Sequence, residues 1–239
     1  MFSLFRRRPK RVHVPGLKQR RDANLQVNRV DLAELTPELI PFLGQAAYLQ
    51  LTVFETLSRA VTMAPSAGSK EAISRVAALS LAKHHGLVAE IRRKGQEPGA
   101  TMAPYTARID QYARTTLGAD WYEILVTSYV TSGLLDDFYC RLAAGLPGEY
   151  STRISALLAG NDGHEFIVTE LRNAIDSNPR LASRLAMWGR RLVGDTLLIA
   201  RSALAGVGNT HRDEARLEPI FTELISAHTR RMDALGLTA

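Results

Sequence analysis

Four side chains of this sequence are candidates for holding a metal ion: Glu55, His84, Asp136 and His164. Carboxylates and imidazoles are the ligands with which helical bundles hold pairs of iron ions, taking one Glu from each of two helices and a Glu-x-x-His pair from each of the other two. If the four side chains converge on one cavity, they predict a non-haem iron centre that uses dioxygen as its oxidant.

The spacing that such a centre requires is missing from the sequence. Residues three apart lie on one face of a helix, so the two side chains of a Glu-x-x-His pair reach the same metal. None of the six histidines has an acidic residue three positions before it. The pattern therefore argues against a regular diiron site and leaves a remodelled one as the alternative.

Two of the candidate carboxylates have structural explanations as well. Glu55 lies two residues after Val53, about 200° around the helix from its apolar stripe, so it is either a ligand on a second buried face or a surface glutamate. Asp136 follows Tyr129 and Gly133 at helical spacing in a stripe of small and polar residues. A carboxylate buried there needs a partner, so the alternative to a ligand is a hydrogen-bond network with Tyr or Arg that fixes helix register.

Neighbouring charges predict two further ion pairs. Asp137 precedes Arg141 by one helical turn, which favours a salt bridge between them. The two arginines at 190–191 are expected to face a groove or another helix, where they can neutralise Asp136 or Asp195. These interpretations give the charged residues structural roles and no catalytic one.

The elements that must position these side chains are helices. After residue 36 apolar residues recur at helical spacing and alternating strand patterns are scarce, so the fold class is all-α. Thr36 caps a helix that begins at Pro37, and Asp120 with Glu123 forms a capping box. The expected helices span about 37–63, 69–94, 105–116, 120–144, 149–175 with an interruption at 160–163, 179–204 and 217–235.

The lengths of these helices predict the architecture. Four of them run to roughly 25 residues, and one long connection, 95–119, joins the second to the third. This combination favours an up-down four-helix bundle with additional C-terminal helices. We expect residues 36–239 to form that single helical domain and residues 1–35 to form a separate basic tail.

The charge of the protein is concentrated in this tail. Residues 1–21 contain eight basic residues and no acid, and subtracting their +8 from the total of +6 leaves about −2 for residues 22–239. A segment of this kind binds phosphate-rich surfaces, either nucleic acid or an anionic membrane, with an affinity that falls as salt rises. The basic residues are Arg6, Arg7, Arg8, Lys10, Arg11, Lys18, Arg20 and Arg21.

Three features of the sequence bear on where the protein is located in the cell. Met1, Phe2, Leu4 and Phe5 precede the basic run, so the tail either lies in a membrane interface or is a solvated, disordered terminus. No segment reaches the roughly 18 apolar residues of a transmembrane helix. Cys140 is the single cysteine, which fits a reducing compartment. We expect a cytoplasmic protein, with peripheral attachment at the inner face of the membrane as a further hypothesis.

Two segments carry a resemblance to a known family. DWYEILVTSYVTSGLLDDFYCRL at 120–142 and MWGRRLVGDTLL at 187–198 resemble the actinobacterial ferritin-like proteins related to the tRNA hydroxylase that acts on methylthio-isopentenyl-adenosine. The resemblance extends over about residues 36–236. It implies a ferritin-like bundle, an iron cofactor, hydroxylation of a modified tRNA base, and a helix face through which two copies can form a homodimer.

The sequence departs from this family at the implied metal. Lys83 and His84 occupy the place where the resemblance puts the first Glu-x-x-His pair, and an ammonium facing the site would repel iron. The place of the second Glu-x-x-His pair is taken by Asp162, His164 and Glu165, which share a helix face only if the helix kinks. Our first hypothesis is a binding or scaffold protein with no cofactor and degenerate diiron ligands; the alternative is a diiron hydroxylase with a remodelled site.

Overall fold

The computed structural model describes residues 35–160, 163–204 and 210–238. All but the last residue of the predicted tail, including its eight basic side chains, lie outside these ranges. The described residues form helices and contain no strand, which confirms the all-α prediction. The helices are α1 (Leu39–Met63), α2 (Ala67–Arg93), α3 (Pro98–Thr116), α4 (Trp121–Thr127), the π-helix η2 (Ser128–Ser132), α5 (Gly133–Ala143), α6 (Glu149–Leu158), α7 (His164–Ser177), α8 (Pro179–Ala203) and α9 (Thr210–Ala234).

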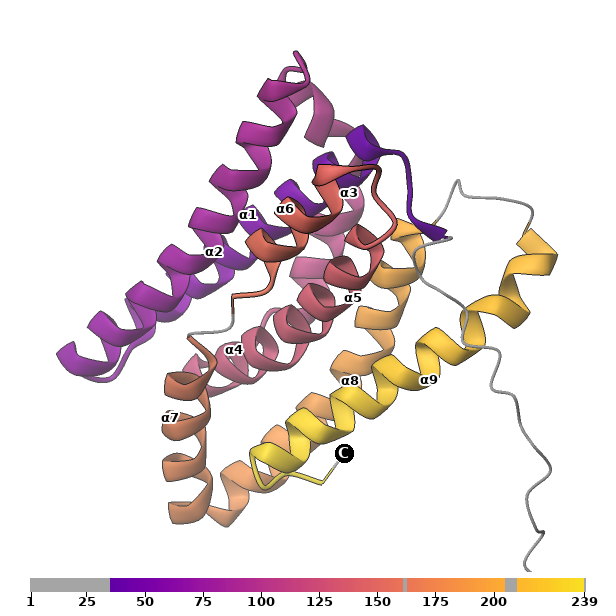
Figure 1. Cartoon of the computed structure of the whole chain (residues 1–239). Coiled ribbons are helices and arrows are strands. Elements are labelled where there is room, and N and C mark those ends of the chain that lie inside the picture. The colour runs from indigo at the N-terminus through magenta and orange to yellow at the C-terminus, as the bar shows by residue number, and fades with distance from the viewer. Residues whose placement is uncertain (1–34, 161–162, 205–209, 239) are drawn as a thin grey trace, which may run out of the picture.

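Four rods close into a bundle (Figure 1). The helices α1 and α2 pack along one another, and α4, η2 and α5 join end to end into a third rod. The fourth rod is divided into α6 and α7, both of which contact α2 and the third rod. The third rod in turn contacts α1 through α4 and η2, so the ring is complete. This is the four-helix bundle that the sequence predicts.

The remaining helices lie around this bundle (Figure 1). Helix α3 forms the crossover between the second and third rods and packs on α1 and α8. Helices α8 and α9 pack against the third rod and against each other, as the predicted additional C-terminal helices. Among the described residues no helix has the length and apolar character needed to cross a membrane.

The apolar core runs along the bundle in two clusters. One is built around Phe42, Leu87 and Phe138, none of which exposes any surface. The other lies toward the opposite ends of α1 and α2 and includes Leu57 and Ile73. Because each rod contributes to both clusters, a rod cannot rotate without exposing apolar surface in both.

The start of the chain's first helix differs from the prediction. Helix α1 begins at Leu39 behind Glu38, which makes no side-chain cap. Thr36, predicted as the cap, instead donates its hydroxyl to the carbonyl oxygen of Leu142. The hydroxyl therefore ties the entrance of α1 to the end of α5 and leaves the first amides of α1 uncapped by a side chain.

Residues 96–104, whose two prolines and one glycine favour a connection, are mostly helical, so the predicted start of the third helix at residue 105 is wrong. Helix α3 starts at Pro98, and the Glu97 carboxylate accepts a hydrogen bond of 2.6 Å from the amide of Ala100. A proline in the first turn of a helix loses no hydrogen bond, so the prolines that suggested a loop are compatible with a helix start. Pro104 lies inside the same helix, six residues later.

The predicted N-cap of the third rod is confirmed, whereas the reciprocal bond of the capping box goes to the residue before the N-cap. Asp120 accepts a 3.0 Å hydrogen bond from the amide of Glu123, and the Glu123 carboxylate accepts one of 2.8 Å from the amide of Ala119. The π-helix in the middle of this rod is not predicted by the apolar pattern. A π-turn inserts one residue into the helix and so rotates everything after it by about 100°.

Candidate functional site

A buried ion pair lies in the interior of the bundle. The ammonium of Lys83 on α2 is 2.6 Å from one carboxylate oxygen of Asp136 on α5, and the side chains are only 10% and 12% exposed. The amide nitrogen of Gln50 on α1 donates to the other carboxylate oxygen, also at 2.6 Å. Three rods therefore meet at one carboxylate.

The energetic balance at this carboxylate is set by burial. Loss of water raises the pKa of Asp136, while the Lys83 charge and the hydrogen bonds from Lys83 and Gln50 oppose that rise. A buried pair repays its desolvation only when the geometry is good and the remaining lone pairs are satisfied. Both carboxylate oxygens have a donor here, which meets that condition.

His84 lies one residue beyond Lys83 on α2 and takes part in a different contact. Its Nδ1 is 2.9 Å from the carbonyl oxygen of Ala47 on α1. Since a carbonyl oxygen only accepts, Nδ1 carries the proton and the other ring nitrogen, Nε2, is left unprotonated in the neutral ring. Glu55 on α1 is exposed, as the surface alternative predicts.

His164 lies at the start of α7 against the π-helix. Its ring packs edge to face on Tyr129 of η2, with the ring centroids 5.4 Å apart. Burial, together with the positive charges of Arg231 and Lys83, lowers the pKa of His164 to about 4. The imidazole is therefore neutral at physiological pH. It lines a cavity of about 440 Å³ with Tyr129, Arg231 and Asp137.

Asp137, on the same helix as Asp136, has a different partner from the one predicted. Its carboxylate is 2.6 Å from the guanidinium of Arg231 on α9, while Arg141 pairs with Glu223. A side chain at Gly133 would place its Cβ 2.6 Å from Nε of Arg231, so this glycine allows the guanidinium to approach the rod. The ion pair joins α9 to the bundle.

The arginines at 190–191 do not neutralise Asp136, whose cation is Lys83. Arg190 donates to the carbonyl oxygen of Thr238 at 3.2 Å, and the guanidinium of Arg191 lies 5.3 Å from the ring centre of Trp188. The Arg190 bond ties α8 to the segment that follows α9, whereas the Arg191 contact lies within α8 itself.

Sequence reasoning missed a second buried carboxylate. Glu90 on α2 is 3% exposed and pairs with Arg153 of α6 at 2.8 Å and with Arg93. Burial opposes its charge, but the hydrogen bonds and charges of the two arginines outweigh burial and hold its pKa below the ordinary value. The spacing of Glu90 and Arg93, three residues apart, could have predicted one of these two ion pairs. The pair with Arg153 could not be predicted in this way, because Arg153 is distant in sequence.

The comparison with protein families agrees with this architecture. A family model described as "Ferritin-like domain, actinomycetes" matches residues 35–207. The chain belongs to this family. The match spans the four rods of the ferritin-like bundle, the crossover helix α3 and helix α8. No curated protein is matched.

The candidate ligands among the described residues are not gathered into one metal site. Among the described residues, no group of three or more His, Cys, Asp and Glu side chains lies close enough to hold a metal ion. Asp136 is engaged by Lys83, Glu55 is exposed, and Asp162 lies outside the described ranges. The charges that lower the pKa of His164 belong to cations, and the same field would repel a metal ion.

Proposed function

We propose that this ferritin-like protein works by binding and not by diiron oxidation, and that its basic tail attaches it to an anionic partner. One observation supports the first part most directly. The ammonium of Lys83 lies 2.6 Å from Asp136 inside the bundle, so the best-placed carboxylate already has a counter-cation from the chain itself. In this proposal the ion pair keeps the bundle together where a family relative with iron would use its metal.

The experiment that tests this part measures metal directly. Tag-free protein produced in iron-replete medium is analysed by mass spectrometry for bound metals. We expect far less than one iron per chain. About two irons per chain would overturn the proposal and favour the alternative, a hydroxylase that acts on a modified tRNA base through Glu55, His84, Asp136 and His164.

A variant sharpens the metal experiment. If Lys83 replaces a metal, removing its charge in Lys83→Gln leaves Asp136 without a cation and adds no more than one neutral amide oxygen as a ligand. We expect this variant also to remain free of iron. Iron uptake by Lys83→Gln, with none by the unmodified protein, would show that a ligand set is present and that the lysine alone excludes the metal.

The second part of the proposal concerns the tail. Its eight basic residues precede a body of net charge about −2, so attraction to an anionic surface must come from the tail. Each basic residue near an anionic membrane contributes roughly 1 kcal/mol, and the attraction falls within a Debye length. The apolar Phe2, Leu4 and Phe5 beside the basic run favour a membrane surface over nucleic acid.

Vesicle binding tests this part. The full chain is sedimented with vesicles that contain anionic lipid and with purely zwitterionic vesicles, and a tRNA filter-binding assay is run in parallel. We expect retention on anionic vesicles alone, weakened by salt and abolished by deletion of residues 1–21. A matched variant, Phe2, Leu4 and Phe5 all to Ser, keeps every charge and reports the apolar contribution. Equal vesicle binding by the deletion variant would refute the membrane role, and tRNA binding in its place would assign the tail to nucleic acid.

A further inference from the structure

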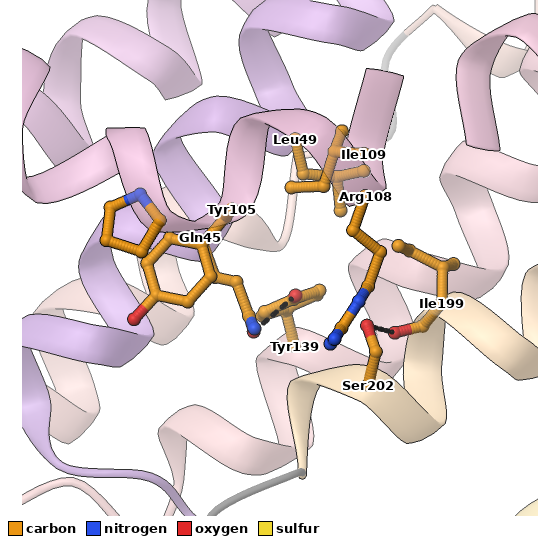
Figure 2. Close-up of a pocket in the computed structure, with 9 residues that line it drawn as sticks. Gln45, Leu49, Tyr105, Arg108, Ile109, Tyr139, Ile199 and Ser202 are labelled. Carbon is orange, nitrogen blue, oxygen red and sulfur yellow. Dashed lines mark hydrogen bonds between the residues drawn. The ribbon is translucent and has the colours of Figure 1, made fainter. Parts of the chain in front are cut away.

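A second pocket, separate from the ion pair, lies between the crossover helix and the bundle (Figure 2). It has a volume of about 240 Å³ and is lined by side chains of α1, α3, α5 and α8. Beside it α3 approaches α1 closely at Gly44, where a Cβ would lie 2.4 Å from the carbonyl oxygen of Thr101 and 3.0 Å from the ring of the lining residue Tyr105. The pocket therefore lies where the crossover helix packs on the bundle.

Two polar groups of this pocket, the Arg108 guanidinium and the Gln45 amide, can donate hydrogen bonds to a ligand. The guanidinium of Arg108 points into the pocket (Figure 2), and no ion pair joins Arg108 to another described residue. The Gln45 side chain is 8% exposed, and its amide oxygen accepts a 3.0 Å hydrogen bond from the Tyr139 hydroxyl. That bond uses the amide oxygen, and no residue that the structure describes accepts from the Gln45 amide protons.

The pocket has no acidic side chain among its lining residues. Its remaining walls are apolar and come from Leu49, Ile109 and Ile199, with the Tyr105 ring beside Gly44. A cation and amide protons facing apolar walls suit a ligand that is negative at one end and apolar at the other. Phosphate esters fit less well, because one guanidinium would leave part of their charge unpaired on an apolar surface.

The volume sets the size of this ligand. A cavity of about 150 Å³ accommodates benzene, so about 240 Å³ accommodates one ring or a short alkyl chain together with a carboxylate. Guanidinium and carboxylate match each other as two parallel hydrogen bonds. We propose that this pocket binds a small organic monocarboxylate, with the carboxylate on Arg108 and the Gln45 amide and the apolar body against Leu49, Ile109 and Ile199.

Benzoate and its neutral analogue benzamide are the probes. Binding to the full chain is followed by isothermal titration and by NMR line shifts, with unfolding temperatures recorded for every variant. We expect benzoate to bind and benzamide to bind at least about tenfold more weakly, because the charge-assisted contact is lost. Arg108→Gln should weaken benzoate by a similar factor.

Two variants separate this site from unspecific attraction. Arg114→Gln removes the same charge from the same helix, and Arg114 is exposed like Arg108 but does not line the pocket, so this variant should leave benzoate binding unchanged. Ser202→Phe keeps Arg108 but fills the pocket, and should abolish binding. The inference is overturned if benzoate does not bind at about 10 mM, if benzamide binds equally well, or if the two arginine variants behave alike. None of these results depends on iron content or on the tail, so the proposed function is judged separately.

Discussion

Replacing Lys83 with methionine tests the central ion pair. The substitution keeps most of the apolar stem and leaves the Asp136 carboxylate, itself 12% exposed, with Gln50 as its remaining donor. Removing one partner of a buried pair costs about 3–5 kcal/mol. Because Gln50 still donates, we expect the lower end, about 3 kcal/mol, which corresponds to a fall of about 6–12 °C in Tm for a domain of this size.

The pH dependence of this loss carries the sharper information. Without Lys83 the buried Asp136 has a pKa raised further above its unfolded value, so the folded state binds a proton more readily than the unfolded state. Stability contributed by that proton is present at low pH and lost as pH rises. The deficit of Lys83→Met relative to the unmodified protein should therefore shrink between pH 7 and pH 5.

Urea unfolding at both pH values measures these quantities, and the double variant Lys83→Met, Asp136→Leu completes a double-mutant cycle. Replacing both partners by apolar side chains of similar volume should restore most of the lost free energy. If Lys83→Met costs less than about 1 kcal/mol and the cost is the same at pH 5, the pair behaves as a solvated surface pair, and the reasoning is wrong.

Three further variants test other contacts. The pKa of His164 is about 4 in the folded protein and about 6.5 in the unfolded chain, so lowering the pH between these values should remove roughly 2 kcal/mol of stability. Unfolding measured as a function of pH should show a smaller loss in His164→Phe. Arg153→Gln removes two hydrogen bonds to buried Glu90 and should cost about 2 kcal/mol in urea unfolding, whereas no loss would mean that Arg93 suffices. Gly44→Ala pushes a Cβ toward the Thr101 backbone, so it should cost about 1–3 kcal/mol of stability and also weaken benzoate binding. Unchanged benzoate binding would mean that the pocket does not depend on the close approach of α3 to α1.

Sequence patterns predicted the helices of the bundle well because the information is local. Residues close together in the sequence determine both the helix start at Asp120 and Glu123 and the interruption between α6 and α7. Helix periodicity likewise identified the all-α class and the four long rods. Helix α3 was shortened because its prolines were interpreted as a loop, although Pro98 occupies a first-turn position.

The partners of the charged residues could not be predicted in the same way. Asp137 was assigned to Arg141 because they lie one turn apart, yet Arg231, 94 residues away, takes that place. Glu90 has a distant partner in Arg153. Spacing along one helix identifies possible partners on that helix only. A charged residue on another helix can form the same ion pair, and which of the two partners is used depends on how the rods pack.

The π-helix explains why the predicted polar stripe on the third rod is divided. With regular helical spacing, Tyr129 and Asp136 share a face, and the sequence predicts one stripe that contains both. The residue inserted at Ser128–Ser132 rotates the following turn by about 100°, so Tyr129 faces His164 beside Asp137, while Asp136 faces Lys83 and Gln50. One stripe in the sequence thus supplies two environments: a buried ion pair that joins three rods, and an open cavity with a neutral imidazole. A single metal centre would need ligands from both environments, and the rotation within the rod is what keeps them apart.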